Sequence, residues 1–382
     1  MDVFGEPAAA ILRDYWAQIV AALISVFAIA FRDAIFRYLR LLYDAIALLF
    51  RIRRAVKSDS PWLVRKPRPE ATLGRSDIPI LTVANLKGGV GKTTIAANLA
   101  GYFCSEAASR RDPTRKHRVL VVDLDFQGSL SSMVLKYDDR IPNPNTQSKA
   151  SKAITGALTS EAVADAIQGK ETDFIQVIPA YYDLATIELR ALMQWLIEDF
   201  KGDLRYILRE LLLSRSVQDR FDIVIIDCPP RLTTAMIQAL CASTHLLIPT
   251  KLDRMSGEAV GTFVDQLERL RLLWPKLRIL GAVGTMVSQD PILGGQLPEA
   301  EDIGEIMVRT AVRTVYENRN MNPPHEFMFP RQTYIAEKAA IARHAGDRIT
   351  YLNLMHNAQD VSLREMIRRL GRYVEERMYE SL

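Results

Sequence analysis

Residues 83–100 read VANLKGGVGKTTIAANLA, and this stretch decides the fold. Gly88, Gly89 and Gly91 follow an apolar run and precede Lys92, where a helix-forming segment begins. Glycines let the backbone curl so that successive N–H groups point inward, and the start of a helix adds the positive end of its dipole. A strand, a glycine-rich turn and a helix in this order predict a loop that binds phosphate groups.

The loop departs from the usual pattern G-x-x-x-x-G-K-[ST]. Leu86 stands where the first glycine belongs, and a second lysine, Lys87, follows it. Lys92 holds the position of the lysine that contacts the β- and γ-phosphates, and the Thr93 hydroxyl holds the position that coordinates Mg²⁺. The sequence therefore predicts a nucleoside triphosphate loop with an additional lysine at its edge.

Carboxylates end two further apolar runs. Asp123 and Asp125 lie in VLVVDLDFQGS (119–129), and Asp227 lies in FDIVIIDCPP (221–230). Residues two apart on an extended strand point the same way, and ligands of parallel sheets bind at the carboxyl ends of the strands. We expect Asp227 to hold Mg²⁺, directly or through water, at this edge.

Short apolar runs alternate with helical stretches from residue 80 onward. Strands so apolar are buried on both faces, which predicts a mostly parallel sheet with helices on each side, in one doubly wound α/β domain. A polar loop is expected at 138–152. The expected strands are 80–85, 118–125, 174–179, 221–227, 245–250 and 278–287, and the helices include 92–109, 183–214, 256–274 and 299–318.

The N-terminal segment is of another kind. Residues 15–31 are seventeen residues without a charge, at the short end of what a membrane-spanning helix needs. Residues 32–68 hold ten basic and three acidic residues, which favours the cytoplasm for that side. Within 32–54 the charges form a narrow stripe, typical of a helix in a membrane interface. A helical hairpin packed against a partner subunit is the alternative.

Charge and composition set the expected division of the chain. The first 80 residues hold twelve Lys and Arg against eight Asp and Glu, so the whole net charge of +4 lies there. The balanced remainder gives no compositional argument for a nucleic-acid-binding core. Three widely spaced cysteines indicate neither a disulfide framework nor a zinc site. We expect a helical extension and possible membrane anchor at 1–56, a linker at 57–78 and an ATPase-like domain at 79–382.

The motifs KGGVGKTT, VLVVDLDFQGS and FDIVIIDCPP, in this order, resemble the deviant Walker A, Walker A′ and Walker B motifs of the ParA/MinD family of ATPases. The stretches VIPAYYDLATIELR, ALCASTHLLIPTKLDRMSGEAV and FPRQTYIAEKA are also similar to ParA proteins, and the resemblance covers roughly residues 79–355. It implies a P-loop NTPase domain, ATP and Mg²⁺ as cofactors, a homodimer that sandwiches ATP, and slow hydrolysis stimulated by a partner.

The resemblance also implies roles for single residues. Lys87 would be the signature lysine, which crosses a two-fold dimer interface to the nucleotide of the other subunit. Asp125 would position or activate the attacking water. Asp123 would orient the Mg²⁺ shell, together with Thr93 and Asp227. The nucleotide would be bound by Lys87, Gly88, Gly89, Val90, Gly91, Lys92, Thr93 and Thr94, with Pro330 and Arg331 on its adenine side.

The favoured function is a membrane-associated ParA-like switch that recruits, positions or regulates an unknown protein. Its ATPase domain would lie in the cytoplasm, attached to the inner membrane of a bacterium through residues 8–54. The alternative is partitioning of DNA or another cargo through non-specific DNA binding by the arginines at 364, 368 and 372, although the neighbouring glutamates favour a solvated helix face. A bacterial tyrosine kinase fits less well, because only Tyr373 and Tyr379 lie near the C-terminus. A non-catalytic scaffold is disfavoured, because every residue that Mg-ATP requires is present.

Overall fold

The computed structural model divides into two compact units. One contains Met1–Val64 and Leu196–Glu198, and the other contains Arg65–Trp195 and Asp199–Leu382. The residues that the structure describes are 7–58, 60–67, 75–106, 114–135, 147–164, 167–168, 172–197, 202–292, 296–324, 326–344, 347–355 and 357–379.

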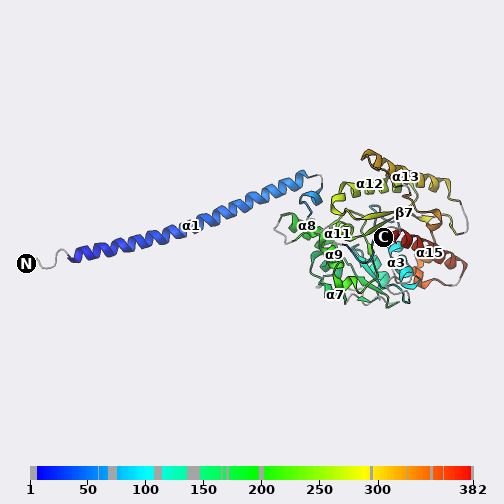
Figure 1. The fold of residues 1–382 in the computed structure, drawn as a ribbon, viewed down its shortest axis with the longest axis horizontal. Coiled ribbons are helices and arrows are strands. Elements are labelled where there is room, and N and C mark those ends of the chain that lie inside the picture. The colour runs from blue at the N-terminus through cyan, green and yellow to red at the C-terminus, as the bar shows by residue number, and fades with distance from the viewer. Residues whose placement is uncertain are drawn as a thin grey trace, which may run out of the picture. The chain divides into compact units, whose positions relative to one another are not determined.

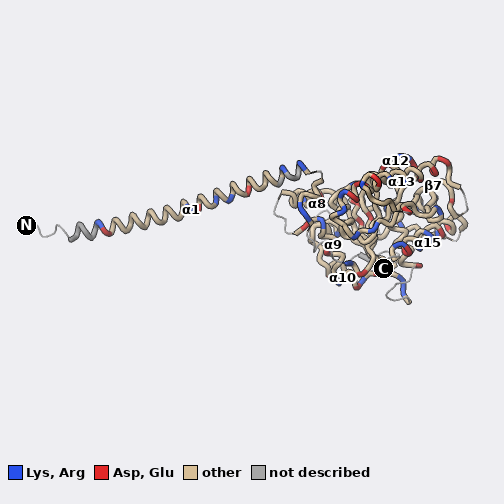
Figure 2. The backbone as a smooth tube through the Cα atoms, turned by 45° about the horizontal axis from the view of Figure 1, so that its top comes forward, with Lys and Arg blue, Asp and Glu red and all other residues tan. Residues whose placement is uncertain are grey.

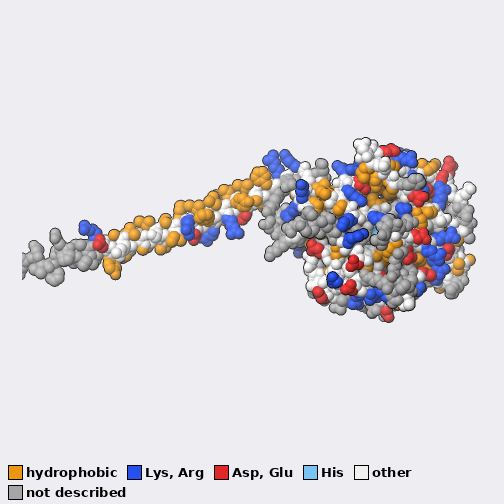
Figure 3. Space-filling model, viewed as in Figure 1, with side chains coloured by type: hydrophobic (Ala, Val, Ile, Leu, Met, Phe, Trp, Pro, Cys, Tyr) orange, Lys and Arg blue, Asp and Glu red, His pale blue; other side chains and the backbone are white. Residues whose placement is uncertain are grey.

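The first unit consists mainly of one helix, α1 (Pro7–Lys57). Its 51 residues correspond to a length of about 76 Å at 1.5 Å per residue. The large apolar side chains that are described along it, from Tyr15 to Ile52, are exposed except for Leu48, which is half-buried. Figure 2 shows charged residues near the start of α1 and then a long stretch without any. Figure 3 shows hydrophobic side chains covering most of the visible face, with charged side chains gathered along one edge in the middle.

The second unit is built on one sheet. In the described part of the chain its eight strands run in the order β3-β4-β2-β5-β1-β6-β7-β8. Neighbouring strands are parallel except for the pair β3–β4. The strands are β1 (Ile80–Val83), β2 (Val119–Asp123), β3 (Ile167–Gln168), β4 (Ile175–Ile178), β5 (Ile223–Asp227), β6 (His245–Thr250), β7 (Arg278–Val287) and β8 (Ile335–Ala336).

Helices flank this sheet (Figure 1). They are α3 (Lys92–Ser105), α4 (Ser129–Val134), α6 (Lys149–Thr155), α7 (Ser160–Ala164), α8 (Asp183–Ile197), α9 (Ile207–Leu212), α10 (Arg215–Gln218), α11 (Thr234–Ala242), α12 (Arg254–Arg269), α13 (Glu299–Asn318), α14 (Ala339–His344) and α15 (Ala358–Tyr379). The short 3₁₀ helices are η1 (Pro61–Leu63), η2 (Leu204–Tyr206), η3 (Arg271–Leu273), η4 (Arg331–Thr333) and η5 (Thr350–Asn353).

The core lies where α3 packs on the central strands β1, β2 and β5, with α15 against its outer side. Every residue of β1, β2, β5 and β6 is buried, which explains why their sequences are nearly continuous runs of Val, Ile and Leu. Gly371 allows α15 to lie close, because a Cβ there would be 2.4 Å from the Tyr102 ring. The predicted α/β class with a mostly parallel sheet is confirmed.

Several local predictions were wrong. The predicted helix 183–214 is interrupted: α8 ends at Ile197, and η2 and α9 follow Gly202, whose φ of +104° lies in the left-handed region. The predicted polar loop 138–152 is helical from Lys149, where the Ser148 side chain accepts the Ser151 N–H, and its part at 138–146 lies outside the described residues. The helix α1 continues without a break through residue 32, where the uncharged stretch 15–31 meets the charged stripe. The strands β3 and β8 were not predicted.

Candidate nucleotide-binding site

The loop between β1 and α3 is held at both ends. At its start, the Asn85 side chain donates Nδ2–H to the Pro249 carbonyl at 2.8 Å and accepts the Lys87 N–H at 3.0 Å. At its end, the Thr285 hydroxyl donates to the Val90 carbonyl at 2.8 Å. Since these contacts tie the loop to β6 and β7, its backbone is set in place by the sheet and not by the loop sequence alone.

Two glycines give the loop its curl. Gly89 has a φ of +68°, and Gly91, the N-cap of α3, has a φ of +80°. Residues with a Cβ rarely adopt this left-handed region, so the sequence position of these glycines follows from the backbone geometry. Gly88 and Gly89 are exposed, which leaves this part of the loop accessible to a ligand.

Lys92 is already in place inside the loop. Its side chain is buried, with only 7% of the residue exposed, and Nζ donates to the Lys87 carbonyl at 2.9 Å. Burial lowers the pKa of Lys92, although the nearby acidic groups, Asp227 first, act in the other direction. A buried ammonium group that is less well stabilised than in water is suited to meet the charge of a phosphate.

Lys87, the additional lysine, has its own partners. Its Nζ lies 3.0 Å from Oδ1 of Asp253 and donates to the Ser256 hydroxyl at 2.8 Å. Asp253 is the N-cap of α12 and also accepts the Ser256 N–H at 2.8 Å. Although burial of the carboxyl acts the other way, the hydrogen bonds from Ser256 and Lys87 hold the pKa of Asp253 below its usual value. In the chain by itself, Lys87 is thus bound within its own domain.

Asp123 and Asp227 face each other on neighbouring strands, because they are register partners of β2 and β5. Both are fully buried. Burial raises the pKa of Asp123 to about 7, although hydrogen bonds from the Ser131 N–H at 2.8 Å, the Ser131 hydroxyl at 2.7 Å and the Asp125 N–H at 3.0 Å oppose the rise. For Asp227, burial and then the charge of Asp123 raise the pKa well above its ordinary value.

The Asp227 carboxylate is the group most in need of a ligand. Neither of its two buried oxygens has a hydrogen-bond partner within the described part of the chain. The Thr93 hydroxyl and the Lys92 ammonium group are close enough to lower its pKa in part. A buried carboxylate of this kind is costly unless a cation meets it, and Mg²⁺ is usually held by one or two protein oxygens together with phosphates and water. The residues present therefore fit a divalent cation.

Asp125 differs from Asp123 more than its sequence spacing indicates. Since β2 ends at Asp123, Asp125 lies in the following turn, and the two carboxylates do not share one extended strand. Asp125 is half-buried, and its Oδ1 accepts the Gln127 N–H at 3.1 Å. The predicted strand 118–125 therefore ends two residues early, and of the two aspartates only Asp123 lies on it. The turn instead separates a buried carboxylate from one that is accessible to water.

Pro330 and Arg331, expected on the adenine side, lie at the start of η4, directly before β8. Because β8 pairs with β7 at Thr285, the same residue that contacts the phosphate loop, the fold brings this segment to the edge of the sheet where the phosphate loop lies. The Arg331 guanidinium donates to Asp302 and, at 2.9 Å, to Glu305, both on α13. A contact with a nucleotide stays a prediction.

Several residues of the site were not identified from the sequence. Asn85 and Thr285 hold the loop, Ser131 binds Asp123, and Asp253 and Ser256 bind Lys87. Asn85 directly precedes the loop and could have been suspected. The others act across sequence separations of up to 195 residues and carry no local signal.

The parallel sheet, the glycine loop and the paired buried carboxylates define a P-loop nucleoside triphosphatase fold. A family model described as an AAA domain matches residues 78–279. The chromosome partitioning protein ParA of Myxococcus xanthus is 30% identical over 242 residues, which are 62% of this chain and 73% of that protein. The chromosome-partitioning ATPase Soj of Thermus thermophilus is 30% identical over 226 residues, 58% of this chain and 75% of that protein. The chain therefore belongs to the ParA-like family of P-loop ATPases.

A solved structure agrees with this assignment at the level of the fold. A Cyanothece McdA variant in complex with ATP is similar to this chain with a TM-score of 0.58 and 19% sequence identity, covering 79% of this chain and 98% of that one. At this identity the likeness shows the fold alone. The resemblance stated from the three Walker-type motifs is confirmed.

Proposed function

We propose that this chain is a dimerising switch ATPase that uses ATP and Mg²⁺ and is attached to the cytoplasmic membrane of a bacterium by α1. In this account it recruits, positions or regulates an unidentified partner, which stimulates a slow hydrolysis. The observation that carries the proposal is the pair formed by the buried Lys92 and the unpartnered Asp227 carboxylate at one glycine loop. The Lys92 ammonium group would be stabilised by an anion and the Asp227 carboxylate by a cation, and Mg-ATP supplies both.

The residues would share the work as follows. Lys92 and the loop N–H groups would bind the phosphates, with Thr94 at the start of α3, and Thr93 and Asp227 would hold Mg²⁺, oriented by Asp123. Bound Mg²⁺ would neutralise phosphate charge as the terminal phosphate leaves. Asp125, accessible to water in its turn, would orient the attacking molecule.

Lys87 would supply the switch. It would leave Asp253 and contact the nucleotide of a second copy, so that a stable dimer would depend on bound ATP. The dimer, its partner and the slow turnover belong to this proposal.

Membrane attachment rests on α1. Of the described residues, only the helix segment Arg13–Phe50 is long and apolar enough to cross a membrane, which is weak evidence when taken alone. A hydrocarbon core is about 30 Å thick, so α1 is more than twice as long as a span requires. The uncharged residues 15–31 would enter the bilayer, and the rest of α1 would continue along the interface or into the cytoplasm. In this proposal 1–56 is the anchor, 57–78 the linker and 79–382 the ATPase domain.

Flotation of the full-length protein with lipid vesicles tests the attachment. Ile24→Arg places a charge in the middle of the uncharged stretch and should shift protein from the vesicle to the soluble fraction, since such a charge costs roughly 3 kcal/mol. Ala47→Arg adds the same charge in line with Arg40, Asp44 and Arg51 and should float like wild type. Wild-type protein that is soluble and monodisperse without detergent would contradict the membrane anchor and favour burial of α1 against protein.

A second candidate is the partitioning of DNA or another cargo, which the similarity to the chromosome-partitioning proteins ParA and Soj favours. The predicted arginine stripe gives it less support than expected. Arg364 donates to the Leu354 carbonyl at 2.8 Å and Arg368 pairs with Glu106 at 2.8 Å, while Arg372 is exposed. ATP-dependent retention of duplex DNA, lost in Arg372→Glu, would establish this function instead.

A further inference from the structure

A cavity of about 540 Å³ lies at the end of the sheet opposite the phosphate loop. It is lined by residues at or next to the starts of three parallel strands, among them Pro79 before β1, His245 on β6 and Arg278 on β7, and by Met378 and Tyr379 at the end of α15. The loop follows the other end of β1. This cavity is therefore separate from the nucleotide-binding site.

The lining of the cavity is strongly basic. Four cationic side chains, Arg75, Arg209, Lys276 and Arg278, contribute to it, against the single carboxylate of Asp77. Arg75 and Lys276 are exposed at its mouth, whereas Arg209 is buried. Cations that converge on one cavity create a positive potential, which a low-dielectric wall strengthens.

Arg209 places a buried guanidinium group in the wall of the cavity. Only 8% of the residue is exposed, and its Nη1 donates to the Cys241 carbonyl at 3.1 Å. Burial lowers the pKa of Arg209, which means that its surroundings stabilise the guanidinium charge less well than water does. An anion in the cavity would reverse this deficit.

His245 adds a neutral hydrogen-bonding group. It is 8% exposed, its Nδ1 lies 2.8 Å from the Thr244 hydroxyl oxygen, and its buried Nε2 has no hydrogen bond of ordinary geometry to any residue that the structure describes. Burial, and then the charge of Arg278, lower the pKa of His245 to about 4. A hydrogen bond with the Met378 backbone opposes this fall in pKa, and the imidazole is uncharged at neutral pH.

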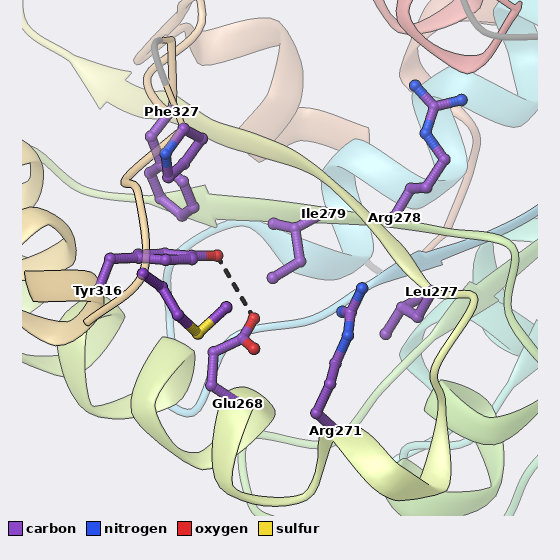
Figure 4. A pocket seen from close by; sticks show the side chains of 9 residues that line it. Glu268, Arg271, Leu277, Arg278, Ile279, Tyr316 and Phe327 are labelled. Atoms are coloured by element: carbon purple, nitrogen blue, oxygen red, sulfur yellow. Dashed lines mark hydrogen bonds between the residues drawn. The ribbon is translucent and has the colours of Figure 1, made fainter. Parts of the chain in front are cut away.

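Figure 4 shows in which direction the Arg278 side chain leaves β7. It draws a neighbouring pocket in which Ile279 and Tyr316 lie together and the Tyr316 hydroxyl is bonded to Glu268 at 3.4 Å. The Arg278 side chain points away from this group, as expected for consecutive residues on a strand. Glu268 thus pairs on one side of β7, while the Arg278 charge is directed to the other.

We propose that this cavity binds the phosphate group of a small anionic ligand, either a soluble phosphate ester or polyphosphate or the headgroup of a phospholipid. Arginine forks match the geometry of phosphate oxygens, and hydrogen bonds between charged groups are roughly twice as strong as neutral ones. Arg209 and Arg278 would hold the phosphate from within, with His245 beside them. Arg75 and Lys276 would attract it at the mouth.

Binding of pyrophosphate and of glycerol 3-phosphate to full-length protein in non-ionic detergent, measured by calorimetry, tests this. Lys92→Ala serves as the background, so that the nucleotide loop does not contribute. Within it, the double variant Arg75→Glu/Lys276→Glu changes only exposed side chains, so the fold should persist, and Arg209→Met removes the buried guanidinium. Arg313→Glu, an exposed change on α13, is the matched control.

We expect the Lys92→Ala protein to bind at least one of the two ligands. The double variant and Arg209→Met should each lower the affinity for that ligand by a factor of about ten or more, because charge-assisted hydrogen bonds are lost. Arg313→Glu should leave the affinity unchanged. Preference for pyrophosphate assigns a soluble source, and preference for glycerol 3-phosphate assigns a headgroup. The proposal is overturned if the Lys92→Ala protein binds neither ligand, if the double variant binds like the control, or if the variants weaken only the retention of duplex DNA.

Discussion

The ammonium group of Lys87 lies 3.0 Å from a carboxylate oxygen of Asp253, 166 residues further along the chain. The same carboxylate caps α12 by accepting the Ser256 N–H. The lysine that the family resemblance assigns to a second subunit therefore has a partner in its own domain before any dimer forms. In the proposed switch, Asp253 and the nucleotide of the second copy compete for Lys87.

Weakening the Lys87–Asp253 pair should favour the dimer. Asp253→Asn removes the charge but keeps a good N-cap, since Asn and Asp cap helices about equally well. The pair is partly exposed and worth up to about 1 kcal/mol, and each dimer breaks two of them, so ATP-dependent dimerisation should tighten by up to about thirtyfold in a titration by light scattering. Glu258→Gln, which removes the exposed pair with Arg254 on the same helix, is the control. Weaker dimerisation of Asp253→Asn would show that the pair supports the dimer.

Lys92→Ala should remove nucleotide binding. The lysine is the buried cation of the loop, and the remaining N–H groups cannot offset the charge of a triphosphate. The affinity for a fluorescent ATP analogue should fall on the order of a hundredfold, which corresponds to the loss of hydrogen bonds from a charged donor. A circular dichroism spectrum like that of wild type shows that the fold is kept. Tight ATP binding by this variant would refute the assignment of the loop.

Asp125→Ala should separate binding from hydrolysis. The loop, Lys92 and Asp227 are untouched, so ATP should bind with its affinity little changed. The attacking water would lose its orienting carboxylate, and hydrolysis in a single turnover should slow by a factor on the order of a hundred, as for loss of a general base. Gln127→Ala, in the same turn, controls for disturbance of the backbone. Wild-type hydrolysis by Asp125→Ala would assign the role to another residue.

His245 should make the protein less stable in acid. Its pKa is about 4 in the folded chain and about 6.5 in the unfolded one, so the unfolded state binds more protons between these values. The contribution is complete above pH 6.5 and is lost as the pH falls toward 4. Between pH 7.5 and 4.5 the free energy of unfolding should fall by about 2 kcal/mol more in wild type than in His245→Gln, measured with urea. Equal losses would show that the imidazole is not buried in its neutral form.

How far the sequence predicts this structure depends on whether the signal is local. The strands were found because a parallel sheet buried on both faces demands continuous apolar runs such as IVIID at Ile223–Asp227. The phosphate loop was found because left-handed φ angles at Gly89 and Gly91 require glycine. Both signals lie within a few consecutive residues.

The rest depends on contacts between distant segments. The break between α8 and α9 was missed although Gly202, with its left-handed φ, is a local signal for it, whereas the short strands β3 and β8 are two residues each, too brief for a periodicity. The Lys87–Asp253 pair joins the phosphate loop to the N-cap of α12. Neither residue signals this pair in the sequence, because each side chain could be hydrated by water instead. The basic cavity collects Arg75, Arg209 and the neighbouring pair Lys276 and Arg278 from three separate segments.

Sedimentation velocity of the full-length protein in non-ionic detergent tests the central claim, a dimer that depends on ATP and on Lys87. The account predicts a monomer with Mg-ADP, a dimer when Asp125→Ala is given Mg-ATP, and a monomer again when Lys87→Ala is added to that variant, although it still binds ATP. A dimer that forms equally with ADP, or one that persists with Mg-ATP after Lys87→Ala, would contradict it.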